Sequence, residues 1–170
     1  MNYLIGDATE PVAEGNKIIC HICNDIGKWG AGFVLALSKR WYQPEMAYKK
    51  LFRTQAINNR LELGQTKLIQ VEPDIYVANM VAQFGFDFVN GQPPIRYKAL
   101  QQCLNNVAVA ATLLDASVHM PKIGCGIAGG DWSVIEPIIT YTLESKGIPV
   151  FVYTLPDSKR RCRVWNNQKM

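Results

Sequence analysis

The stretch PKIGCGIAGGDW, residues 121–132, places four glycines within seven positions between two segments of regular pattern. The segment that leads into these glycines, SVHMPKI (117–123), is strand-like, and the residues from Ser133 onward follow a helical pattern. Glycine weakens both helices and strands, so such a cluster needs a local reason. Either the chain makes only a tight turn here, or its backbone must approach a phosphate group closely.

Working outward from this loop, strand-like and helix-like segments alternate along the chain. Strands are expected at 2–5, 17–23, 66–72, 75–83, 117–123 and 148–155. Helices are expected at 30–41, 44–54 and 94–115, and a last helix is expected where Ser133 and Glu136 form a capping-box pattern. This alternation predicts a three-layer α/β/α sandwich around a mixed, largely parallel six-stranded sheet. The irregular stretch 84–94 is long enough to serve as a lid or a binding loop.

Composition limits the classes of protein to consider. The chain has 170 residues, of which 48% are hydrophobic and 19% charged, as in an ordinary globular domain. There is no apolar run of about 18 residues and no basic leader before the first strand. We therefore expect a cytoplasmic protein without membrane contact and without disulfides. No second Cys/His pair follows CHIC (20–23) at zinc-finger spacing, and Cys20 and Cys23 would face opposite sides of a strand, so we expect no zinc. We expect no cofactor.

The basic charge of the chain is concentrated at its end. Residues 158–170 hold five Lys/Arg and no acid, whereas the rest holds 13 Lys/Arg against 14 Asp/Glu. The sequence thus divides into a domain, 1–156, and a basic tail, 157–170. The tail residues Lys159, Arg160, Arg161, Arg163 and Trp165 could contact nucleic acid through phosphates and stacking. The alternative is a solvated or docked C-terminus.

Ligands of open α/β sheets bind beyond the carboxyl ends of the strands. Glycine-rich segments follow the expected strands 17–23 and 117–123, and each leads into a helix. Two such loops can present backbone N–H groups to two phosphates, which suits a pyrophosphate. The sequence contains neither a G-x-x-x-x-G-K-[ST] motif nor a G-x-G-x-x-G motif after its first strand.

Several motifs together resemble those of macro domains. They are GDAT (6–9), ICHICN (19–24), GAGF (30–33), PKIGCGIAGGDW (121–132) and the final strand VFVYTL (150–155). The form HICND…WGAG is similar to a divergent branch of the family. That branch includes terminal ADP-ribose–protein glycohydrolases and yeast-type ADP-ribose 1''-phosphate phosphatases.

The resemblance implies an ADP-ribose site. By this resemblance Asp7 accepts the adenine amino group, with Ala8 beside it, and Tyr153 or Leu155 borders the adenine. Asn24 approaches the distal ribose. Two backbone segments line the diphosphate and distal ribose: Gly30, Ala31, Gly32 and Phe33, and Gly124, Cys125, Gly126, Ile127 and Ala128. Gly126 is expected to need a positive φ.

The chain departs from the glycohydrolase pattern in two places. It has no lysine after the fourth strand, and Ala128 stands where that branch has its catalytic acid. The nearest replacement acid is Asp131. Together with Asp25 or Asp131, His21 could activate a water molecule, with Asn24 orienting the distal ribose.

Two functions of different kinds remain open at this point. One is hydrolysis of ADP-ribose 1''-phosphate or of an ADP-ribosyl ester on a protein. The other is a non-catalytic ADP-ribose reader whose tail contacts a partner or nucleic acid. A nucleic-acid-binding module driven by the tail is a third, more distant reading.

Overall fold

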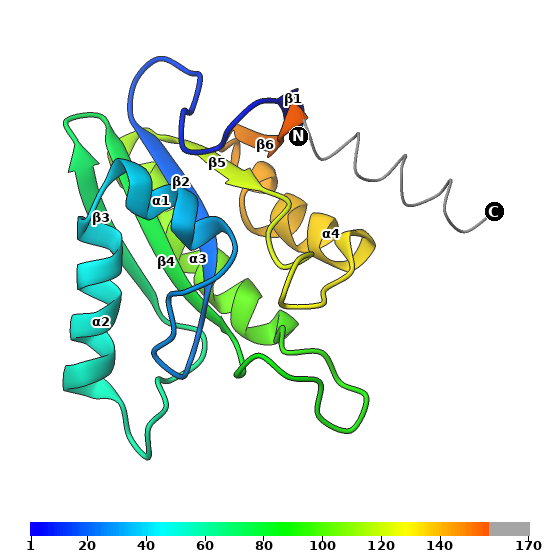
Figure 1. Ribbon diagram of the computed structural model, residues 1–170. Coiled ribbons are helices and arrows are strands. Elements are labelled where there is room, and N and C mark those ends of the chain that lie inside the picture. Colours follow the sequence, from blue (N-terminus) through cyan, green and yellow to red (C-terminus); the bar gives the residue numbers. More distant parts are fainter. Residues whose placement is uncertain (157–170) are drawn as a thin grey trace.

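The computed structural model describes residues 1–156, in which strands and helices alternate along the chain (Figure 1). The strands are β1 (Asn2–Ile5), β2 (Lys17–Asn24), β3 (Thr66–Glu72), β4 (Ile75–Gln83), β5 (Ser117–Pro121) and β6 (Val150–Thr154). The α-helices are α1 (Phe33–Arg40), α2 (Gln43–Gln55), α3 (Tyr97–Leu114) and α4 (Trp132–Thr142), and a short 3-10 helix, η1 (Glu144–Lys146), follows. The predicted basic tail lies outside the described residues, so its role stays a prediction. Within residues 1–156, none of the helices has the length and apolarity needed to cross a bilayer.

The six strands form one sheet in the order β1-β6-β5-β2-β4-β3. Every neighbouring pair is parallel except β3 and β4, which are antiparallel. The carboxyl ends of the five parallel strands therefore meet at one edge. The predicted mixed, largely parallel sheet is confirmed.

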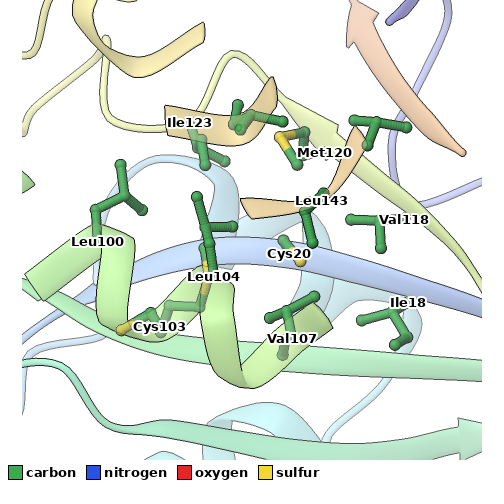
Figure 2. Close-up of a cluster of buried hydrophobic side chains, with 14 of the residues drawn as sticks. Ile18, Cys20, Leu100, Cys103, Leu104, Val107, Val118, Met120, Ile123 and Leu143 are labelled. Carbon is green, nitrogen blue, oxygen red and sulfur yellow. The ribbon is translucent and has the colours of Figure 1, made fainter. Parts of the chain in front are cut away.

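Helices cover both faces of this sheet, and side-chain alternation along β2 shows why. Ile18 and Cys20 are fully buried against α3 and α4, in a cluster that Figure 2 shows in close-up. Ile19 and Cys23 belong instead to a second cluster with α1 and α2. Because alternate side chains of a strand point to opposite faces, β2 needs apolar residues at nearly every position. Cys20 and Cys23 lie on opposite faces, as the sequence predicted.

Two helices begin later than the sequence pattern indicated. We expected a helix from residue 30, but α1 begins at Phe33, because Gly32 adopts φ 82° and ψ −147° as its N-cap. We expected the longest helix from residue 94, but α3 begins at Tyr97, because Ile95 still pairs with Gln83 in an isolated bridge. Residues 30–32, which thus lie outside α1, line the site described below.

The capping box expected for the last helix does not form. Asp131, not Ser133, is the N-cap of α4, and its Oδ1 accepts hydrogen bonds from Ser133 N at 2.9 Å and Ser133 Oγ at 2.7 Å. Glu136 accepts a hydrogen bond from Trp132 Nε1 at 2.9 Å instead. The acid immediately before the helix is the better placed acceptor for the free N–H groups of its first turn.

Candidate functional site

The site lies where the hydrogen-bond ladder between β2 and β5 stops. These strands pair only from Lys17–Ser117 to Ile19–His119. Beyond Ile19 they separate, and a cavity of about 230 Å³ opens between their carboxyl ends. After β2 the chain continues to one side of the sheet, and after β5 it continues to the other side. Ligands of open α/β folds usually bind at such a reversal point.

Ten of the residues that the sequence predicted for the site line this cavity: His21, Asn24, Gly30, Ala31, Gly32, Phe33, Gly124, Gly126, Ile127 and Ala128. They come from segments about 100 positions apart in the chain. The glycine-rich segments after β2 and β5 therefore form two facing walls, as a ligand with two phosphates would require.

The wall from α1 presents a helix end with no side-chain cap. Gly32 is the N-cap residue of α1, and no side chain accepts a hydrogen bond from the N–H groups of the first turn. The first turn also contains no acidic residue. A free helix N-terminus at a cavity favours an anionic group.

The opposite wall is a turn in which glycine is present for different reasons at different positions. A Cβ on Gly124, which has φ 76°, would lie 2.5 Å from the Ile95 side chain, and one on Gly130 would lie 2.5 Å from the carbonyl oxygen of Gly124. Gly126 has no positive φ, and a Cβ there would meet nothing within 4 Å. The expectation of a positive φ at Gly126 was therefore wrong. Gly126 faces open space in the cavity, and so does Gly30 by the same measure.

His21 lies at the cavity with only 2% of its surface exposed. Its Nε2 lies 2.5 Å from Asn79 Oδ1. The ring of Trp29 is nearly perpendicular to the imidazole and that of Phe33 is tilted to it, at centroid distances of 5.4 and 6.1 Å. Burial lowers the pKa of His21 to about 4, so the ring is neutral at pH 7. Its Nδ1 has no hydrogen-bond partner among residues 1–156.

Asn24 holds the backbone that follows β2 and leads to α1. Its Oδ1 accepts hydrogen bonds from Ile26 N and Lys28 N, both at 3.1 Å, and from Tyr48 Oη at 2.7 Å. Its Nδ2 donates to Lys28 O at 2.7 Å. An amide nitrogen carries two hydrogens, so one donor remains for a ligand in the cavity that Asn24 lines.

The neighbouring acid, Asp25, is already paired. Arg60 donates to both of its carboxylate oxygens, at 3.0 and 2.9 Å, and Gly85 N donates to Oδ1 at 2.9 Å. Asp25 does not line the cavity. The predicted assistance of His21 by Asp25 thus has no geometric support.

The other predicted residues lie outside the cavity lining. Asp131 is exposed and caps α4, while Asp7 Oδ1 accepts hydrogen bonds from Thr9 N and Thr9 Oγ1, both at 2.8 Å. The Tyr153 hydroxyl accepts from Val12 N at 3.0 Å. Ala8, Cys125 and Leu155 are also absent from the lining. Their predicted roles, including catalysis by Asp131, stay predictions.

Charge distinguishes the cavity from an ordinary catalytic cleft. Among the described residues, its lining includes Lys28 and Lys122 but no Asp or Glu. Neither these lysines nor Trp29 was predicted as a site residue, although all three line the cavity, and so do Gln83 and Phe86 at the end of β4. Strand ends and glycine positions are readable in the sequence, whereas the direction of a long exposed side chain is not. The cavity suits an anion. Among residues 1–156, the ionisable groups that line it are the two lysines, the thiol of Cys23 and the imidazole of His21.

No model of a known protein family matches the chain. The chain is 48% identical to a macrodomain protein from Streptomyces coelicolor of known structure, covering 90% of this chain and 97% of that one with a TM-score of 0.79. A Bacteroides thetaiotaomicron protein of unknown function is 51% identical, with coverages of 89% and 96% and a TM-score of 0.85. The chain belongs to the macrodomain family.

Two relatives of known kind differ in how much of their length the chain matches. The chain is 33% identical over 170 residues to mouse chromodomain-helicase-DNA-binding protein 1-like, and this match covers 95% of the chain. The chain spans only 18% of the length of that relative. It is 26% identical to an ADP-ribose 1''-phosphate phosphatase from Meyerozyma guilliermondii, covering 82% of this chain and 91% of that protein.

Proposed function

We propose that this macrodomain binds ADP-ribose and hydrolyses a derivative of it. The observation that carries the proposal is the cavity itself, which has two backbone walls, two lysines and a buried neutral histidine. The similarity to an ADP-ribose 1''-phosphate phosphatase supports the same class of substrate. The two substrates that we propose are ADP-ribose 1''-phosphate and an ADP-ribosyl ester on a protein.

The walls fit a diphosphate linked to a sugar. The uncapped end of α1 and the turn around Gly126 can each direct N–H groups at one phosphate, and Lys28 and Lys122 add positive charge. The cavity is smaller than a whole nucleotide sugar requires. We place the adenine beyond its rim, at the carboxyl ends of β1 and β6, where Asp7 and Tyr153 lie.

In this proposal, His21 positions the attacking water. A neutral imidazole accepts a hydrogen bond at its unprotonated nitrogen, which orients a water molecule for attack. The water oxygen bonds to the phosphorus or to the ester carbon as the bond from that atom to the ribose oxygen breaks, and the leaving ribose oxygen takes up a proton from the water. A base with a pKa of about 4 abstracts a proton weakly at pH 7. We therefore assign His21 to the orientation of water, and Asn24 to holding the α1 wall and contacting the distal ribose. No lysine of the glycohydrolase type is needed.

A reader that binds ADP-ribose without turnover is the second candidate. The absence of carboxylates from the described cavity lining favours it, because the remaining base, His21, has a pKa of about 4 and abstracts a proton weakly at pH 7. In that case an ADP-ribosylated protein is the partner, and hydrolysis is absent.

Calorimetry with ADP-ribose, followed by incubation with each proposed substrate, tests the proposal. We expect binding, and we expect release of phosphate from ADP-ribose 1''-phosphate or of ADP-ribose from the modified protein. His21→Gln should keep the binding and lose the turnover. Binding without turnover by the unaltered chain would leave the reader, and no binding would overturn both candidates.

A further inference from the structure

One buried amide connects the cavity histidine to helix α2. Asn79 lies on β4 directly across from His21 in the register of the two strands, and only 1% of its surface is exposed. Its Oδ1 lies 2.5 Å from His21 Nε2, and its Nδ2 donates to the carbonyl oxygen of Pro44 at 3.0 Å. Asn79 thus has a fixed partner on each side.

These two contacts determine where the proton of the imidazole lies. The carbonyl oxygen of Pro44 can only accept a hydrogen bond, so the nitrogen of the Asn79 amide must face it. The amide oxygen then faces His21, and it can also only accept. His21 Nε2 must therefore carry the hydrogen. Rotating the amide by 180° would set two acceptors against each other at Pro44, which burial makes costly.

The other ring nitrogen is consequently an acceptor. In a neutral imidazole with a proton on Nε2, Nδ1 has a free lone pair. This atom of His21 is buried and has no partner among residues 1–156, although the ring lines the cavity. A buried polar atom without a partner is costly unless a ligand or water satisfies it.

We propose that Asn79 is a positioning residue, which holds His21 in the tautomer protonated at Nε2 so that Nδ1 accepts a hydrogen bond from a water or hydroxyl group in the cavity. This inference rests on the proposed function for its catalytic consequence. It also restricts the ligand, because a lone pair attracts a hydroxyl donor and repels a phosphate oxygen. The phosphates then bind at the two backbone walls, and a hydroxyl or water binds at His21.

The surroundings of His21 leave Asn79 as its controlling polar neighbour. Cys23 Sγ lies 3.9 Å from Nε2, and burial raises the pKa of this thiol, so it stays uncharged. Trp29 and Phe33 contribute ring contacts only. Replacing Asn79 therefore changes the tautomer without changing another charge beside the ring.

The tautomer can be measured without any assay of activity. The chain contains two histidines, so ¹⁵N-edited NMR of the imidazole nitrogens gives two sets of signals, and His21→Gln assigns them by loss. His119→Gln is the matched control, because it removes the other buried ring and must leave the His21 signals. We expect Nε2 protonated and Nδ1 unprotonated at pH 7. A proton on Nδ1 in the unaltered protein would overturn the proposal.

Two variants then test the role of Asn79. Asn79→Leu removes the acceptor, and we expect the Nε2–H signal to be lost and kcat to fall roughly tenfold or more with KM almost unchanged. Asn79→Asp keeps an acceptor but adds a negative charge, so His21 should gain a second proton and the acid limb of the pH–rate profile should move to higher pH. A structural role alone would not move that limb.

The outcomes separate this inference from the proposed function. Absence of turnover by the unaltered chain would defeat the proposed function, whereas the NMR result would still decide the tautomer. An Asn79→Leu protein that keeps both the Nε2–H signal and normal kcat would overturn the positioning role. Should Asn79→Leu fail to fold, Asn79→Asp and the unaltered protein still give the decisive spectra.

Discussion

Asp25 holds Arg60 with both carboxylate oxygens, at 3.0 and 2.9 Å, although the two residues are 35 positions apart in the chain. The carboxylate is 2% exposed and the guanidinium 41% exposed, and the guanidinium also lies 3.7 Å from the ring centre of Phe84. Because Asp25 also binds Gly85 N, this pair fixes the start of the 84–94 loop beside the cavity. Asp25 therefore acts on the site through the backbone.

The two partners of this pair should not be equally important for stability. Arg60→Met leaves a buried carboxylate without its cation and should lower the free energy of unfolding by about 2–4 kcal/mol. Asp25→Asn leaves a half-exposed guanidinium that water can solvate, so its cost should be about 1 kcal/mol. Urea unfolding of both variants and the double variant measures this difference, and equal costs would contradict it.

Asp131 has one observed role and one predicted role, and a conservative change separates them. Asn caps helices as well as Asp, so Asp131→Asn keeps the cap of α4 and removes the carboxylate. Because this carboxylate lies outside the cavity lining, we expect Asp131→Asn to retain turnover and Asp131→Ala to lower the melting temperature. A loss of about 10²–10⁴-fold in kcat for Asp131→Asn would establish catalysis by this acid.

Gly126 and Gly30 should tolerate larger side chains in the folded protein but not in the complex. Neither has a positive φ, and a Cβ at either position meets open space. Gly126→Val and Gly30→Val should therefore fold and bind ADP-ribose at least about tenfold more weakly, because the side chain fills the cavity. Gly130→Val is the contrasting variant and should unfold the domain, since its Cβ would lie 2.5 Å from Gly124 O. Calorimetry and thermal melting distinguish the two classes.

Asp7 should contribute to affinity through the oxygen that its local turn does not use. Oδ1 accepts from Thr9, which leaves Oδ2 for the adenine amino group. Asp7→Ala should weaken ADP-ribose binding by about 1.5–3 kcal/mol, the value of a charge-assisted hydrogen bond. Thr9→Val is the control for the turn itself, and calorimetry on folded protein decides. Unchanged affinity in Asp7→Ala would remove Asp7 from the site.

Acid should destabilise the domain through its two histidines. Burial lowers the pKa of both His21 and His119 to about 4. The unfolded chain binds these protons near pH 6.5, whereas the folded chain binds them only near pH 4, so stability falls as pH decreases across that window. Urea unfolding between pH 7 and pH 4 should show uptake of about two protons, and His21→Gln and His119→Gln should each remove about one. A flat profile across this range would contradict the lowered pKa values.

Most of the sheet and half of the site were predictable because their signals are local. Apolar runs such as IYVANMVAQ (75–83) coincide with strands, and the glycines after 23 and 123 mark the turns that border the cavity. The sequence resemblance added the family, which the comparison with the Streptomyces protein confirmed. Local pattern was sufficient where one segment determines its own conformation.

The remaining features depend on contacts between distant segments. Ser133 and Glu136 match a capping box, yet Asp131 is the N-cap, because its side chain accepts the hydrogen bond from Ser133 N that Glu136 would accept in such a box. Asn79 stands in an apolar strand, and nothing near it in the chain shows that it faces His21, 58 positions away. Such pairs appear only once the sheet register is known.

The short ladder between β2 and β5 has a mechanical consequence. Only three register pairs join the half-sheet β3-β4-β2 to the half-sheet β5-β6-β1, so the two halves are hydrogen-bonded at one end of their boundary and separate at the other. Any molecule held between the α1 wall and the Gly126 turn spans that opening and ties both halves together. Binding would then reduce local opening of the sheet far from the cavity, and amide hydrogen exchange along β5 and β6 would slow.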